Sequence, residues 1–201
     1  MNWKDVPLPK RMQALPKDAR GFPIPHIVAY DSHGKPQFTV NDQHKVLLAL
    51  TDGLCAICGQ PLPKSDVWMV GGPRSAFDPR GCYVDGPLHG DCARYALRVC
   101  PYLAVSMMKY RSMKDLEKMA GRFDGTKILF DPTVDPDRPI LFAMVRTEQI
   151  GMTPNGYLVP QRPYLDAEFW SGGEEMTRAE ATVKLAEIGL DITKQIVWTG
   201  I

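Results

Sequence analysis

The chain has 201 residues, of which 44% are hydrophobic and 23% charged, and its formal net charge is +1. These values are typical of an ordinary globular protein with a core of its own. No stretch approaches the roughly 18 consecutive apolar residues of a membrane span, and the first residues, MNWKDVPLPKRM, carry charges and prolines where a signal peptide needs an apolar run. We therefore expect a cytoplasmic protein with reduced thiols and no membrane partner.

The first 25 residues form a proline-rich segment, with prolines at positions 7, 9, 16, 23 and 25. Proline fixes its own backbone angle and lacks an amide hydrogen, so such a segment tends to run irregularly and to stay out of helices and sheets. We predict that residues 1–25 form an extended arm over the surface and contribute no core element.

A hairpin and a short helix are expected next. Residues 26–30 and 37–40 have strand-like composition and flank a glycine-containing turn. Asn41 or Asp42 can cap a short apolar helix, and Gly53 follows at the position where a left-handed residue would end it.

The middle of the chain is expected to hold a second hairpin followed by a helix. Residues 67–70 and 82–84 have strand-like composition, with glycine and proline turns between them. After Pro87 the apolar residues recur at helical spacing, and Pro101 should end or kink this helix. The apolar stripe consists of Ala93, Ala96, Leu97 and Cys100. We therefore interpret Cys100 as a buried core residue.

Several elements are expected beyond this helix. A capping-box pattern at Ser112 and Asp115 predicts a helix that ends near Ala120. Strands are expected over residues 140–145 and 157–159 and near residues 168–170, with a turn at residues 154–156. A second capping box, formed by Thr177 and Glu180, predicts a last helix that Gly189 ends.

Charge is unevenly distributed along the chain. Residues 94–127 contain 8 Lys or Arg and 3 Asp or Glu, whereas residues 128–201 contain 6 and 11. An acidic, proline-rich connection over residues 131–139 lies near this change. We therefore predict an α+β domain over residues 26–125 and an acidic, β-rich C-terminal subdomain over residues 126–201 that ends in a helix.

Four soft side chains are spaced as two half-sites for one metal ion: Cys55 with Cys58, and His89 with Cys92. Two residues separate the members of each pair, as is typical of tetrahedral zinc sites. Gly59 supplies the backbone freedom for a tight turn at the first pair, and the second pair would share one face of the first turn of a helix. Four protein ligands leave no open position for a substrate, so we predict a structural Zn²⁺ ion.

The order of a metal-binding turn, a hairpin and a helix with the last two ligands resembles a treble-clef zinc finger. Cys82 lies between the half-sites and could replace His89 as a ligand if the helix begins elsewhere. We therefore predict a treble-clef-like, zinc-stabilised core with short hairpins and helices.

HNH nucleases mount catalytic histidines on a similar scaffold. Residues 59–88 contain no histidine, and the remaining histidines all precede the first half-site, where we interpret them as ordinary surface or packed residues. These residues are His26, His33 and His44. Nuclease chemistry would need one of them together with Asp78 and Asp85, so we lean against an enzyme and assign no catalytic residue.

A longer pattern of motifs extends beyond the four soft side chains. The segments are LPKDARGFPIPHIVAYDSHGKPQF, LCAICGQPL, GGP and DGPLHGDCARYALRVCPYL, which contain RGxPxP, CxxCG, GP and PxHxxCAxxA motifs and a CPFL-like ending. In this order they resemble a family of uncharacterised proteins encoded by bacteria, phages and prophages. The similarity runs from about Leu15 to Tyr110, with a weaker one in the C-terminal FW and TRAEA segment. Tyr102 replaces the usual Phe, and the segment before His89 is longer than in the family. The resemblance implies a zinc-holding fold and a mobile-element origin, and it implies no reaction.

Two functions compete. In the first, the protein is a non-catalytic module whose basic stretch contacts DNA or RNA, with tyrosines available for stacking, although a plain solvated helix face would also explain such a charge run. The candidate residues are Arg94, Arg98, Lys109, Arg111, Lys114, Lys118 and Arg122, with Tyr95, Tyr102 and Tyr110.

In the second function, the protein is a host-modulating factor that binds a protein partner through an adaptable, methionine-rich apolar surface. Plain packing of the methionines in the core would explain them equally well. The residues of this surface would be Met107, Met108, Met113 and Met119. A diverged HNH-like nuclease is a third alternative.

Overall fold

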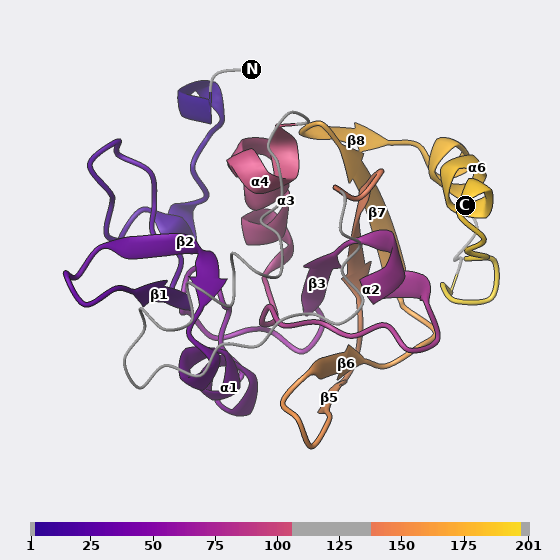
Figure 1. Ribbon diagram of the computed structural model, residues 1–201, viewed down its shortest axis with the longest axis horizontal. Helices are drawn as coiled ribbons and strands as arrows, with labels where there is room; N and C mark the ends of the chain where they lie inside the picture. The colour runs from indigo at the N-terminus through magenta and orange to yellow at the C-terminus, as the bar shows by residue number, and fades with distance from the viewer. Residues whose placement is uncertain (1–2, 106–137, 198–201) are drawn as a thin grey trace.

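The computed structural model describes residues 3–105 and 138–197. Within these residues the strands form one four-stranded sheet and two two-stranded sheets, and helices are interspersed among them. Figure 1 shows the N-terminal elements on the left, the four-stranded sheet on the right and the helix α3 (Gly90–Val99) between them. The fold is therefore α+β, as predicted.

The four-stranded sheet is antiparallel and combines both halves of the chain. Its strand order is β3 (Trp68–Gly71), β4 (Phe142–Arg146), β7 (Asp166–Ser171) and β8 (Glu174–Met176). The first four residues of β4 are buried and the fifth is half-buried, which is the pattern of a central strand covered on both faces.

The prediction of a second hairpin between residues 67–70 and 82–84 is wrong. β3 pairs with β4 instead, from Trp68 opposite Arg146 to Gly71 opposite Ala143. The chain after β3 forms the short helix α2 (Pro73–Phe77), whose first residue is a proline, a residue well suited to that position. In place of a hairpin, Trp68 makes an isolated backbone bridge with Leu88, just before α3.

The first hairpin and the helix that follows it are confirmed. β1 (Val28–Tyr30) pairs with β2 (Pro36–Asn41) in antiparallel orientation. α1 (Gln43–Thr51) begins at once, because the Asp42 side chain caps it by accepting hydrogen bonds from two amides of its first turn. Gly53 adopts a positive φ of 64° just after the helix, as expected of a residue that ends it.

Residues 3–25 pack on the core. They contain two short 3-10 helices, η1 (Trp3–Asp5) and η2 (Lys10–Met12). Met12 is only 3% exposed and belongs to the main hydrophobic cluster, against which Trp3 and Phe22 also pack. The prediction that this segment contributes nothing to the core is therefore wrong, because apolar side chains between the prolines anchor it.

α3 is followed directly by α4 (Pro101–Ala104), so Pro101 ends the first helix and begins the second. Ala93 and Leu97 are buried as predicted, whereas Ala96 and Cys100 are only half-buried. Their places in the core are taken by Cys92, Tyr95 and Val99. The buried surface of α3 is thus wider than a single stripe, and the interpretation of Cys100 as a fully buried residue is wrong.

The C-terminal elements agree with the local sequence signals. β5 (Ile150–Met152) and β6 (Leu158–Pro160) form a hairpin around the predicted turn, where Gly156 has a φ of 91°. α6 (Arg178–Glu187) begins with the predicted capping box, in which Thr177 and Glu180 bond each other's backbone amides.

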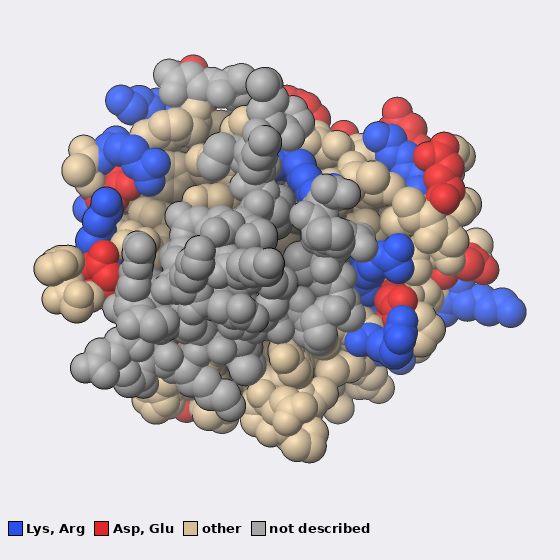
Figure 2. Space-filling model, in the orientation of Figure 1, with Lys and Arg blue, Asp and Glu red and all other residues tan. Residues whose placement is uncertain are grey.

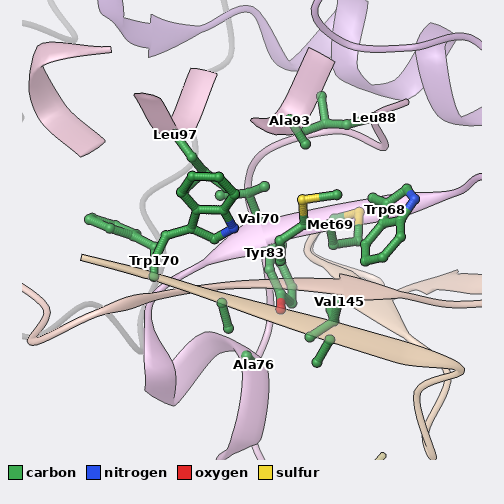
Figure 3. Close-up of a cluster of buried hydrophobic side chains, with 14 of the residues drawn as sticks. Trp68, Met69, Val70, Ala76, Tyr83, Leu88, Ala93, Leu97, Val145 and Trp170 are labelled. Atoms are coloured by element: carbon green, nitrogen blue, oxygen red, sulfur yellow. The ribbon is translucent and has the colours of Figure 1, made fainter. Parts of the chain in front are cut away.

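One core joins the described residues. Figure 3 shows Trp68 and Met69 of β3, Leu97 of α3, Val145 of β4 and Trp170 of β7 gathered in it. The sheet and this core both continue across the boundary expected near residue 126. The predicted helix at residues 112–120 and most of the proline-rich connection lie outside the described residues.

Candidate metal centre

Cys55, Cys58, His89 and Cys92 come together at the start of α3. One ligand atom from each residue lies within 4.8 Å of the other three. The exposed fraction is 0% for Cys55, His89 and Cys92 and 8% for Cys58. None of the cysteines of the chain takes part in a disulfide. The structure thus brings the four residues into one buried cluster whose donors suit a metal ion.

The first half-site is a tight backbone turn. The Cys55 amide donates to the Gln60 carbonyl oxygen at 2.8 Å, and the Gly59 amide donates to the Cys55 carbonyl oxygen at 2.8 Å. Gly59 has a φ of 69°, in the left-handed region that side chains disfavour. This geometry turns the Cys55 and Cys58 side chains toward the same point, as the sequence predicted.

The second half-site begins one residue before the helix. His89 is the N-cap residue of α3, and Cys92 lies in its first turn. The His89 Nε2 atom lies 2.9 Å from the Pro61 carbonyl oxygen. Since a carbonyl oxygen only accepts, Nε2 carries the proton and donates it, which leaves the lone pair on Nδ1. The Nδ1 atom lies 3.4 Å from the Cys58 Sγ atom and is therefore the nitrogen available to a metal ion.

Asp66 holds the start of α3 in place beside the cluster. Its carboxylate accepts a hydrogen bond from the Trp68 Nε1 atom at 2.7 Å and lies 3.3 Å from the Gly90 amide nitrogen. A side chain at position 90 would meet both partners, because a Cβ atom there would lie 3.0 Å from the Trp68 Nε1 atom and 3.1 Å from the Asp66 Oδ1 atom. The glycine therefore allows Asp66 to reach the first amide of the helix.

The three thiols change one another's protonation because they are buried side by side. Hydrogen bonds with Cys58 and Cys92 lower the pKa of the Cys55 thiol, whereas its contact with Cys55 raises the pKa of Cys58 to about 11. Contacts with both neighbours also raise the pKa of Cys92. The side chains alone therefore favour a single thiolate. A bound divalent cation would favour the ionised form of all three, so the donor set fits such an ion.

The N-terminal segment is tied to both half-sites. The Arg11 Nε atom donates to the Asp91 carboxylate at 2.9 Å, next to Cys92. The Gln60 Nε2 atom donates to the Arg11 carbonyl oxygen at 3.1 Å, next to the first half-site. Sequence reasoning missed these contacts, because nothing in the local pattern links residue 11 to residue 91.

Cys82 is not part of the cluster. It is 5% exposed and lies in the segment after α2, where its neighbour Tyr83 bridges to Leu158 of β6. His89 thus stays the fourth member of the quartet, and the alternative in which Cys82 replaces it is not supported by the geometry.

Two of the predicted nucleic-acid contacts lie on α3. The Arg94 guanidinium donates to Glu168 of β7 at 2.9 Å and lies over the Trp68 ring. Arg98 is exposed, and its guanidinium lies 5.3 Å from the centroid of the Trp170 ring. The other five, Lys109, Arg111, Lys114, Lys118 and Arg122, lie outside the described residues, as do the four methionines and Tyr110.

Of the tyrosines proposed for stacking, Tyr95 is 5% exposed and packs in the core. Its proposed role in stacking is therefore wrong, because a buried ring presents no face to a base. Tyr102 is half-buried.

The residues considered for nuclease chemistry are not members of the quartet, although His26 lies against the first half-site, where a Cβ atom on Gly59 would be 3.1 Å from the His26 Nδ1 atom. His26, His33 and His44 are exposed, as interpreted from the sequence. The Asp78 carboxylate pairs with Arg80, and the Asp85 carboxylate accepts a hydrogen bond from the Asn41 side chain. Across residues 3–105 and 138–197, the quartet is the only group of three or more His, Cys, Asp or Glu side chains close enough to hold a metal ion.

Comparisons with protein-family models, with curated proteins and with solved structures found no match to this chain. No helix within the described part of the chain is long and apolar enough to cross a membrane. Function must therefore be argued from the site and the surface themselves.

Proposed function

We propose that this protein is a non-catalytic nucleic-acid-binding module whose fold depends on one structural zinc ion. The supporting observation is the burial of three sulfur donors and one imidazole nitrogen within 4.8 Å of one another. Sulfur ligands about 2.3 Å from a tetrahedral zinc lie about 3.8 Å apart, so the cluster needs only a small adjustment to hold the ion. All four positions are then filled by protein, which suits a structural role.

The zinc ion would link two parts of the chain that already lie side by side, since the Ala56 amide donates to the Pro87 carbonyl oxygen at 2.7 Å. It would join the turn at Cys55 and Cys58 to the start of α3, and α3 packs on the four-stranded sheet. Structural zinc contributes about 10–16 kcal/mol in small zinc fingers, against the roughly 5–15 kcal/mol stability of a whole domain. Removal of the ion should therefore unfold the protein.

Exposed basic side chains support the nucleic-acid part of the proposal. Arg98 faces solvent on α3, and Figure 2 shows further Lys and Arg side chains at the upper left, over the N-terminal segment. Arg94 is engaged by Glu168, so we assign it a structural role and remove it from the proposed contacts. The basic residues between positions 109 and 122 remain part of the proposal.

Fluorescence anisotropy with short labelled DNA and RNA oligonucleotides tests the proposal. The affinity should fall steeply with salt, because each phosphate contact on a single strand contributes about −0.7 to the slope of log K against log salt. Arg98→Gln should weaken binding several-fold. Arg80→Gln is the matched control, because the Arg80 side chain is 89% exposed on a distant loop. A lack of affinity for both nucleic acids at low salt would contradict the proposal.

A protein-binding role is the second candidate. The observation that favours it is a pair of adjacent leucines on α1, Leu47 and Leu48, which are 38% and 41% exposed. Adjacent exposed apolar side chains suit a partner surface better than they suit a phosphate backbone. Partner binding that is insensitive to salt and is lost in Leu48→Ser would favour this role over the first.

The family resemblance supports an origin in a phage or prophage. Neighbouring genes for replication, host takeover or packaging would agree with this origin, whereas a conserved set of metabolic neighbours would argue against it.

A further inference from the structure

A cavity of about 240 Å³ opens between the N-terminal segment and α3. Its walls are formed by residues 3–8 on one side and by Lys17, Gly21 and Pro23 on the other, and Tyr95 of α3 also lines it. Trp3 of the first wall packs against Phe22, the residue between Gly21 and Pro23 of the second wall, and the two ring centroids are 5.1 Å apart. The proposed metal centre does not use this cavity.

Trp3 lines the cavity, and next to it aromatic rings and cations alternate among residues outside the lining. Phe22 stacks edge-on between Trp3 and Phe38, and the centroids of Phe22 and Phe38 are 5.8 Å apart. The Lys4 Nζ atom lies 5.8 Å from the centroid of the Trp3 ring, and the Arg20 guanidinium lies within 6 Å of both phenylalanine rings. Trp3 is half-buried, so part of its ring remains available to a flat ligand.

The charge around the cavity is positive. Lys4 and Lys17 are exposed lining residues, against the single carboxylate of Asp5. The nearby Asp18 does not offset them, because its carboxylate is held by Arg20 at 2.7 Å and by the Phe22 amide at 2.9 Å. An anionic ligand with a flat apolar part would therefore be complementary to this site.

The size of the cavity narrows the choice of ligand. Sites for drug-sized molecules usually measure about 300–1,000 Å³, so this one suits a single aromatic ring system. A base within a duplex is stacked and paired and cannot enter it, whereas a base of a single strand is free to turn outward. Lysines at the rim would then meet the phosphates on either side of that base.

We propose that this cavity binds one base of a single-stranded nucleic acid, with Trp3 as a stacking surface and Lys4 and Lys17 as phosphate contacts. This inference rests on the proposed nucleic-acid-binding function and assigns it a surface whose lining does not include Arg98. Asp5 also lines the cavity, and a carboxylate there would suit the amino groups of a base, because it accepts hydrogen bonds.

Anisotropy with a labelled 12-nucleotide single strand and a matched duplex tests the inference in the full-length, zinc-loaded protein. The single strand should bind more tightly than the duplex. Trp3→Ala should weaken single-strand binding by about tenfold. Lys4→Ala combined with Lys17→Ala should lower the magnitude of the salt slope by about 1.4, which corresponds to two phosphate contacts.

Lys64→Ala combined with Lys194→Ala is the matched control, since both lysines are exposed and neither lines the cavity. Unchanged zinc content and circular dichroism would show that each variant is folded. If the protein binds nucleic acid and the cavity variants bind as tightly as the control, this inference is overturned and the proposed function stands. If the wild-type protein binds neither strand nor duplex at low salt, both are overturned.

Discussion

His89 illustrates how one hydrogen bond selects the atom that would bind a metal. The Pro61 carbonyl oxygen, 2.9 Å from Nε2, fixes the proton on that nitrogen and turns Nδ1 toward the thiols. The ring is 0% exposed, so water cannot replace this partner. If the site binds a metal ion, this donor is already in position, which would reduce the ordering that binding must impose.

The identity of the ligand cysteines can be tested by substitution. Cys58→Ser should lower the zinc content from about one ion per chain to near zero and should abolish the cooperative unfolding transition, because oxygen is a much poorer zinc ligand than thiolate here. Cys82→Ser changes a cysteine that is also buried but lies outside the cluster, and it should retain full zinc. Zinc content, measured by atomic absorption on both purified variants, checks this; equal contents would contradict the assignment.

Gly86 packs against the first half-site and leaves no room for a side chain. A Cβ atom at this position would lie 2.9 Å from the Cβ atom of Ala56, a residue that lies between Cys55 and Cys58 in the sequence. Gly86→Ala should therefore destabilise the protein by about 1–3 kcal/mol, the usual cost of overpacking. The control is Gly151→Ala, where the nearest atom would be 3.6 Å away. Urea unfolding of the two variants checks the difference, and similar midpoints would show that the turn can shift at no cost.

Among the elements, α3 is fixed at several points. Asp66 binds its first amide, and Arg94 joins its second turn to Glu168 of β7. The same guanidinium lies over the Trp68 ring of β3. One side chain thus contacts two strands of the sheet and sets the orientation of the helix that carries Cys92.

The Arg94–Glu168 pair should contribute measurably to stability. Glu168→Gln removes the charge but keeps the shape, and we expect a loss of about 1 kcal/mol, since the pair is partly exposed and screened by solvent. Glu148→Gln, at an exposed carboxylate, should change stability little. Urea unfolding of both variants at low and high salt checks this. An equal effect of the two substitutions would mean that the pair is energetically neutral.

At the scale of the whole molecule, the metal centre and the C-terminal strands share one core. β3 follows the first half-site in the chain and belongs to the sheet. Its partner in the sheet is β4, which comes from the other part of the chain. The largest buried side chains come from both parts, including Tyr83, Leu97 and Trp170. Stability should therefore be cooperative across residues 3–105 and 138–197 and should not divide near residue 126.

Metal removal should consequently unfold both parts together. After treatment with a strong chelator, amide hydrogen exchange should become fast in α3 and in β7 alike, since loss of α3 uncovers one face of the sheet. Mass spectrometry of peptides from the two regions would measure this, with the zinc-loaded protein as the control. Persistent protection of β4 and β7 after chelation would instead support two separately folding domains, as the sequence suggested.

The features predicted correctly are those encoded locally. The Asp42 cap, the capping box at Thr177 and the glycine turn at residue 156 each depend on a few neighbouring residues, as does the tight turn that brings Cys55 close to Cys58. The pairing of β3 with β4 depends on packing between distant segments, which periodicity does not report. α2 has five residues, too few to show a helical period. The packing of Met12 and the Arg11–Asp91 pair are likewise long-range, so proline content alone misled the prediction for the N-terminus.

The distance in sequence between the two half-sites also determines how long after the first half-site the second is synthesised. Cys58 and His89 are 31 positions apart, so at about 5–20 residues per second a ribosome adds the second half-site about 2–6 seconds after the first. During that interval only two of the four proposed ligands, Cys55 and Cys58, have been synthesised, and Arg11 has no Asp91 to pair with. We expect a nascent chain that ends just after α3 to capture zinc before β4 has been translated.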